Sequence, residues 1–75
     1  MKVHFTKHAR IRLSERSVTE EQVREAIESP DELVESFGAR FVATKNLSDG
    51  ILRVVFRRAN AIHFVITVYW IGEKV

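Results

Sequence analysis

A histidine and two arginines near the N-terminus are the first residues whose types and spacing suit chemistry. His8, Arg12 and Arg16 follow one another at four-residue intervals, which makes consecutive members neighbours on a helix. Histidine can act as a general acid or base near neutral pH, and arginine holds phosphate through a planar fork of donors. The cluster predicts a phosphate-binding site with a proton-transfer group. The competing interpretation, which spacing alone favours, pairs the arginines with nearby acids such as Glu15 and leaves His8 as a border or helix-capping residue.

A second cluster is expected on one face of the last two strands. Alternation along these strands places five side chains together on the solvent side: Arg53, Arg57, His63, Thr67 and Tyr69. The arginines suit phosphate, and the tyrosine offers a stacking ring or a proton donor. This set contains no acid, whereas an ordinary solvated face mixes both signs of charge. A binding face and a plain solvent face are therefore about equally supported.

The first cluster needs a helix to position it. Thr6 suits the N-cap of such a helix, because a threonine hydroxyl accepts a hydrogen bond from the free amides of the first turn. Phe5, Ala9 and Leu13 form an apolar stripe at helical spacing. We therefore expect a helix that runs to about Arg16, with the cluster at the border of its buried side.

A second helix is predicted over residues 20–29. Thr19 and Gln22 have the spacing of a capping box, in which each side chain bonds the backbone amide of the other residue. Pro30 ends the helix, because it cannot continue the backbone hydrogen bonds and forces the preceding residue out of the helical region. About three residues connect the two helices, which predicts a short helical hairpin.

After residue 30 the apolar period changes from helical to alternating. Short turns separate four expected strands and so favour antiparallel pairing in a meander: 33–37, 40–46, 51–58 and 62–71. Residues 1–5 alternate weakly and are compatible with a short edge strand. The expected fold class is α+β, with a helical hairpin packed on a four-stranded antiparallel meander. Residues 72–75 are expected to form a loose tail.

The last hairpin is expected to turn through a three-residue loop at 59–61. This register pairs Phe56 with Phe64 and Val54 with Ile66. It collects the apolar residues on one face and leaves His63 with the arginines on the other. A shift by one residue would reverse the facing of every side chain, so the clean separation of apolar from charged residues favours this register.

Charge is unevenly distributed along the chain. The net charge is only +2, but basic residues dominate 1–16 and 36–60 while acidic residues dominate 17–35. If the two basic segments meet in space, they form a surface that attracts polyanions. The alternative is a pair of solvated faces that neutralise each other.

The composition restricts the possible chemistry. Seventy-five residues suit one small domain. The absence of cysteine excludes disulfides and thiolate metal sites. The three histidines lack metal-site spacing, so we expect no metal and no cofactor. The longest apolar run, at 64–71, is too short to cross a bilayer as a helix. No signal peptide is apparent, and a cytoplasmic location is expected.

Three segments together resemble a small prokaryotic family without an assigned function. The first is the string His-Ala-Arg-Ile-Arg-Leu-Ser-Glu-Arg at 8–16, which carries the spaced arginines of that family's signature. The second is the threonine-capped acidic helix that ends at Pro30. The third is the pair of strand segments at 52–56 and 65–69. The family in turn resembles a distant branch of the RelE/ParE toxin superfamily, through the order of a helical hairpin before an antiparallel meander.

The resemblance implies a single RelE-like domain over residues 1–75 and a toxin of a toxin–antitoxin pair. Such toxins are metal-independent ribonucleases that act on messenger RNA, often at the ribosome, or else inhibitors of gyrase. An antitoxin neutralises them. Arg53, Arg57 and Tyr69 stand where these toxins place basic and aromatic groups on the sheet, and His8 and Arg12 match the smaller family's signature. The lysine-rich sites and the C-terminal catalytic helix of the best-known toxins have no counterpart.

The resulting hypothesis is a metal-independent RNA endonuclease. Three residues are expected to be catalytic: His8, Arg53 and Tyr69. Four residues are expected to bind the RNA: Arg12, Arg16, Arg57 and His63. The expected partners are RNA, with or without the ribosome, and an antitoxin protein but no membrane, and a homodimer is compatible with so small a core. The alternatives are a non-catalytic module that binds nucleic acid or protein through the same face, and an assembly or regulatory domain.

Overall fold

The computed structural model describes residues 1–72. Within this range the chain forms two α-helices, α1 (Lys7–Glu15) and α2 (Glu20–Glu28), and a short 3₁₀ turn, η1 (Phe37–Ala39). The strands are β1 (Lys2–Phe5), β2 (Glu32–Ser36), β3 (Arg40–Leu47), β4 (Gly50–Ala59) and β5 (Ile62–Gly72). The predicted α+β class is confirmed. Apart from Gly72, which ends β5, the tail that we expected to be loose lies outside the described residues.

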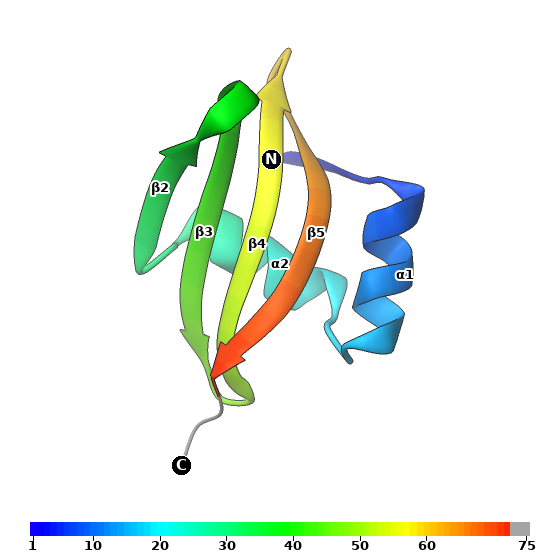
Figure 1. Cartoon of the computed structure of the whole chain (residues 1–75), viewed down its shortest axis with the longest axis vertical. Helices are drawn as coiled ribbons and strands as arrows, with labels where there is room; N and C mark the ends of the chain where they lie inside the picture. The colour runs from blue at the N-terminus through cyan, green and yellow to red at the C-terminus, as the bar shows by residue number, and fades with distance from the viewer. Residues whose placement is uncertain (73–75) are drawn as a thin grey trace.

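The five strands form one mixed sheet in the order β1-β5-β4-β3-β2 (Figure 1). The predicted four-stranded antiparallel meander is therefore wrong in its strand count. β1 joins the sheet parallel to β5, with Val3 beside His63 and Phe5 beside Val65. The other three pairs are antiparallel, as the short turns predicted. A parallel neighbour so distant along the chain leaves no local trace in the sequence.

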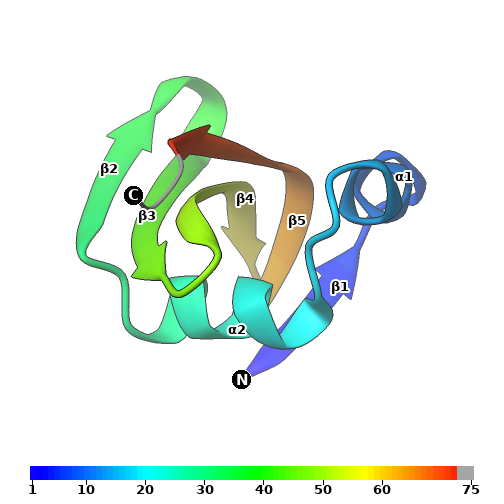
Figure 2. The same ribbon diagram turned by 90° about the horizontal axis from the view of Figure 1, so that it is seen from below.

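The two helices occupy different parts of the sheet. α2 packs against β3 and β4 on one face, whereas α1 packs against β5 and β1 at the sheet edge. Figure 2 shows this division, with α2 beneath the curved sheet and α1 beyond β5. The face turned away from α2 is called the open face below, because neither helix covers it in Figure 1.

Both helices begin as the sequence predicted. The hydroxyl of Thr6 accepts a hydrogen bond of 3.1 Å from the amide of Ala9 and donates one of the same length to the carbonyl of Val65. Thr19 and Gln22 form the complete capping box, with bonds of 3.0 and 3.1 Å. Thr6 therefore caps α1 and also ties its first turn to β5.

The core lies between α2 and the sheet and continues under α1. Leu52, Val54 and Phe56 alternate along β4 and are fully buried. The apolar face of α2 covers this side of β4, whereas that of α1 packs on β5 and β1. The other buried members are Phe5, Ala9, Leu13, Val18, Val23, Ala26, Ile27, Ala43, Leu47, Val65 and Val68. The apolar stripe predicted for the first helix is thus confirmed.

The register predicted for the β4–β5 hairpin is wrong. The turn contains two residues, Asn60 and Ala61, whose φ angles of 52° and 63° are those of a tight hairpin turn. Phe56 pairs with Val65 instead of Phe64, and a bulge then inserts Ile66 as an extra residue of β5. A bulge changes the facing halfway along a strand, which uniform alternation cannot reveal.

Candidate functional site

The open face carries three rows of side chains that run across the strands. Residues directly opposite each other on paired strands face the same side. The row called the Arg53 row crosses from β2 to β5 through Glu32, Thr44, Arg53 and Tyr69. An apolar row follows, through Val34, Val42, Val55 and Thr67. The row called the Arg57 row contains Ser36, Arg40, Arg57 and Phe64.

In the Arg53 row, Arg53 and Tyr69 are direct neighbours on β4 and β5. The Nε of Arg53 donates a hydrogen bond of 3.2 Å to the hydroxyl of Thr44, which fixes the direction of the guanidinium group. No carboxylate forms an ion pair with Arg53 within residues 1–72. Arg53 and Tyr69 are both half-buried. The sheet therefore presents an oriented, unneutralised cation next to a phenol.

These two side chains share a hollow of about 290 Å³ with β2. Its lining also contains Glu32, Val34, Glu35, Ser36 and Val42. A carboxylate, a guanidinium group and a phenol thus border one open space. Alternation along the last two strands predicted no acid near Arg53, because those strands contain none on this face. The pairing of β2 with β3 is what brings Glu32 to the same row.

Asp31 holds this end of β2 in position. Its carboxylate accepts a hydrogen bond of 2.7 Å from the amide of Asn46, and Lys45 Nζ lies 3.8 Å from its other oxygen. The Asn46 amide is the main cause that keeps the pKa of Asp31 below its ordinary value, with Lys45 adding to it and burial opposing it. The Asp31 amide also donates to the carbonyl of Thr44, at 2.8 Å. These contacts place the following residue, Glu32, opposite Thr44.

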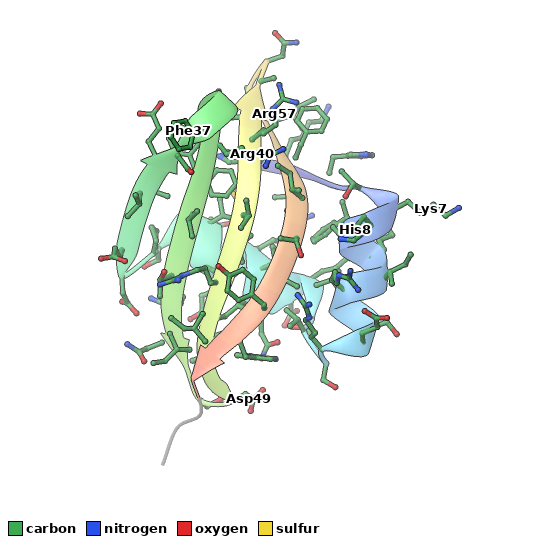
Figure 3. The ribbon with its side chains drawn as sticks, in the orientation of Figure 1. Lys7, His8, Phe37, Arg40, Asp49 and Arg57 are labelled. Carbon is green, nitrogen blue, oxygen red and sulfur yellow. The ribbon has the colours of Figure 1, made fainter. Side chains whose placement is uncertain are left out.

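The Arg57 row places Arg40 and Arg57 directly opposite each other on β3 and β4. Facing like charges destabilise a strand pair unless something neutralises them. Both side chains are exposed, and neither has an ion-pair partner among the described residues. They line a second hollow, of about 300 Å³, with Phe37 and Gly38. Figure 3 shows Arg40 and Arg57 near Phe37 at one end of the sheet.

The α1 cluster lies across β5 from Arg53. Figure 3 shows His8 on the side of α1 that faces β5, whereas Lys7 points away from the sheet. Arg12 forms an ion pair of 2.6 Å with Glu15. This pair corresponds to the interpretation that spacing alone favoured.

Arg16 has a different environment, because it fastens α1 to β5. Its Nη1 donates a hydrogen bond of 2.6 Å to the carbonyl oxygen of Val68. In return, the indole Nε1 of Trp70 donates to the backbone carbonyl of Arg16, at 2.7 Å. One of the donors that we expected to bind RNA is therefore bonded to the protein itself.

His63 lies on the helix-covered face, so its predicted position on the same face as Arg53 and Arg57 is wrong. Its ring centroid is 5.4 Å from that of the core residue Phe56, and its buried Nδ1 has no hydrogen-bond partner within the described range. The two-residue turn and the bulge cause this reversal, because they place His63 and Val65 on the same side as Phe56. The structure therefore places Arg53, Tyr69 and Arg57 of the predicted site on the open face, with Arg57 in a separate hollow, and places His63 on the opposite face.

Four residues of the open face were not predicted from the sequence: Glu32, Phe37, Arg40 and Thr44. Alternation along residues 40–46 could have placed Arg40 and Thr44 on one face. No pattern marks Glu32 or Phe37, because they come from an edge strand and a turn whose position only the folded chain shows. Within residues 1–72, no group of three potential metal ligands occurs, and no helix is long and apolar enough to cross a membrane.

The chain belongs to the family described as a domain of unknown function (DUF4258), which matches residues 5–70. The predicted membership of a small uncharacterised family is thus confirmed. No curated protein shows a significant match to the chain, and no solved structure does.

Proposed function

We propose that this protein is a RelE-like toxin that cleaves RNA without a metal ion. The observation that carries the proposal is the Arg53 row, in which Arg53 and Tyr69 lie side by side in a hollow that Glu32 also lines. A carboxylate, a phenol and a cation can supply the general base, the general acid and the charge stabilisation that metal-independent cleavage of a phosphodiester uses. The order of two helices before an antiparallel set of strands supports the likeness to RelE.

The reaction uses a nucleophile that RNA itself supplies. The 2′-oxygen of one ribose attacks the adjacent phosphorus while the bond from phosphorus to the 5′-oxygen breaks. The products are a 2′,3′-cyclic phosphate and a free 5′-hydroxyl. Glu32 accepts the proton of the 2′-hydroxyl, and Tyr69 donates a proton to the leaving oxygen. Water then restores both groups, so neither proton is lost from the balance.

Arg53 stabilises the negative charge that develops on the non-bridging phosphate oxygens. Its bond to Thr44 orients the guanidinium group before the substrate arrives, which is the condition for electrostatic stabilisation without reorganisation. Loss of such a donor reduces the rate by about 10²- to 10³-fold, and loss of a general acid or base by about 10²- to 10⁴-fold. His8, on the other side of β5, is the second candidate for the proton donor.

RNA cleavage in the presence of a chelator tests the proposal. The variants are Arg53→Ala, Tyr69→Phe and Glu32→Gln, and Lys7→Ala removes one positive charge from a side chain that points away from the sheet. We expect at least a 100-fold loss for each of the first three, on the scale of about 10² to 10³, and no change for Lys7→Ala. Wild-type cleavage rates in Arg53→Ala and Tyr69→Phe would refute the assignment.

The toxin role implies a cytoplasmic partner that blocks the open face. Expression of the wild type in a bacterial host should arrest growth with loss of messenger RNA, and an adjacent gene for a small antitoxin should restore growth. Arg53→Ala should abolish the arrest at equal protein levels. Normal growth of cells that express the wild type would refute the proposed role as a toxin.

A non-catalytic nucleic-acid-binding module is the second candidate. The unneutralised Arg40 and Arg57, which face each other on neighbouring strands, favour it because they need no catalytic partner. This alternative predicts RNA binding that weakens with salt, but no cleavage products under any condition.

A further inference from the structure

Phe37 is the most exposed large apolar side chain of the described residues. It is 93% exposed, whereas the other exposed large apolar side chains reach about half of full exposure. The turn after β2 brings it out of the sheet, because Gly38 and Ala39 both adopt positive φ angles, of 69° and 58°. An uncovered phenyl ring at this place contributes nothing to the core.

Two arginines border the same space. Phe37, Arg40 and Arg57 line the hollow of about 300 Å³ at this end of the sheet. Figure 3 shows them at the same end of the molecule, with Phe37 over the turn and the arginines on β3 and β4. The nearest acid of this segment, Glu35, pairs with Phe41 in the ladder and lines a neighbouring hollow with Ser36 and Phe37. It forms no ion pair with Arg40 or Arg57 within residues 1–72.

We propose that Phe37, Arg40 and Arg57 form a nucleotide subsite for single-stranded RNA. The base stacks on the Phe37 ring, and the phosphate lies between the two arginines, which removes the repulsion between them. The inference rests on the proposed function, because the bound strand continues from this subsite to Arg53. The four residues from Arg53 to Arg57 correspond to about 13 Å along β4. The subsite therefore holds a nucleotide away from the scissile bond.

This chemistry selects single strands. A ring that stands out of the protein can stack on a base only when that base is not already paired and stacked in a duplex. Stacking is tolerant of sequence, because every base has a flat face. The subsite should therefore raise affinity for any single strand and should not choose the cleavage sequence.

The test measures the binding of a fluorescent single-stranded RNA octamer with 2′-O-methyl riboses. Such an RNA cannot be cut, because it has no free 2′-hydroxyl, so binding is separated from catalysis. The variants are Phe37→Leu, Phe37→Tyr and Arg40→Ala in the full chain, with Lys7→Ala as the charge control. Phe37 and Arg40 are exposed, so their substitution leaves the core intact.

Stacking and charge give different signatures. Phe37→Leu should weaken RNA binding about 5- to 150-fold at every salt concentration, because stacking contributes that much per base. Phe37→Tyr keeps an aromatic ring and should bind the RNA as strongly as the wild type does. Arg40→Ala should reduce the slope of log affinity against log salt by about 0.7. A duplex of the same sequence should bind the wild type and Phe37→Leu equally.

Three results would overturn the inference. Binding by Phe37→Leu at wild-type strength would show that the ring does not stack on RNA, while the proposed function would stand on the Arg53 variants. If Phe37→Leu bound the product of the adjacent antitoxin gene more weakly than the wild type does, with unchanged RNA affinity, the ring would belong to a protein interface instead. Absence of any octamer binding at low salt would overturn both proposals together.

Discussion

A structural role and an RNA-binding role for Arg16 predict clearly different results when this residue is replaced. The structure predicts that Arg16→Ala destabilises the fold, because the variant loses the 2.6 Å bond to the carbonyl of Val68. A hydrogen bond from a charged donor contributes about 1.5–3 kcal/mol to the free energy of unfolding. The bond is partly buried, so we expect about 2 kcal/mol, because the freed carbonyl regains some hydration.

This loss is large for a chain of this size. Stability of about 0.05–0.15 kcal/mol per residue gives about 4–11 kcal/mol for the whole domain. A change of about 2 kcal/mol should lower the melting temperature by roughly 8–16 °C. Arg12→Ala is the matched control, since it removes an ion pair with Glu15 that is largely solvated and should cost no more than about 1 kcal/mol.

Urea unfolding followed by the fluorescence of Trp70 measures the free energy, and RNA binding by the folded variants measures function. We expect Arg16→Ala to shift the urea midpoint while the slope of log affinity against log salt stays unchanged. The reverse pattern, with unchanged stability and a slope reduced by about 0.7, would show that Arg16 contacts RNA phosphate and would refute this reasoning.

Two further predictions concern the turns and ends of the sheet. Asp31 has a lowered pKa, so its contribution to stability is present above its ordinary value of 3.8 and is lost as the pH falls below that value. The urea midpoint of the wild type should therefore fall more than that of Asp31→Asn between about pH 6 and about pH 3, and equal falls would contradict this. Ala61→Gly should raise the free energy of unfolding by about 0.5–1 kcal/mol, because glycine adopts the φ of 63° without strain. Ala59→Gly, within β4, is the control and should lower the free energy of unfolding. If Ala59→Gly also stabilised the protein, the positive φ of Ala61 would not explain the effect.

The helices were predictable because their signals are local. The capping box at Thr19 and Gln22 needs only residues within one turn, and Pro30 acts on its immediate neighbours. The strand between 62 and 71 was equally visible from its apolar run. Each of these features depends on interactions that a short window of sequence contains.

The position of β1 was not predictable by the same reasoning. Its hydrogen bonds join Val3 to the ladder beside His63, at the opposite end of the chain. A parallel pair of this kind requires the chain between the two strands to form a crossover connection. The alternation in residues 1–5 indicated a strand but contained no information about its neighbour.

The candidate site was half visible for a related reason. Alternation was enough to put Arg53, Arg57 and Tyr69 on one face, because the bulge at Ile66 returns β5 to the facing that uniform pairing predicts for its second half. The same bulge reverses the first half, which is why His63 was misplaced. Because of this one inserted residue, alternation predicts the correct face of the sheet for one half of β5 and the wrong face for the other half.

The acid of the site depends on still more distant geometry. Glu32 joins the Arg53 row through the pairing of β2 with β3, which the bond between Asp31 and the amide of Asn46 helps to align. A shift of β2 by one residue would turn Glu32 to the helix side and bring Leu33 to face Thr44. Asp31→Asn should thus weaken RNA cleavage, although Asp31 itself does not contact the substrate. The loss should appear in kcat, because a displaced Glu32 would accept the proton less often. Binding should persist, because Arg53 still holds the phosphate. An unchanged kcat in Asp31→Asn would contradict the claim that the Asp31 bond positions Glu32 for proton transfer.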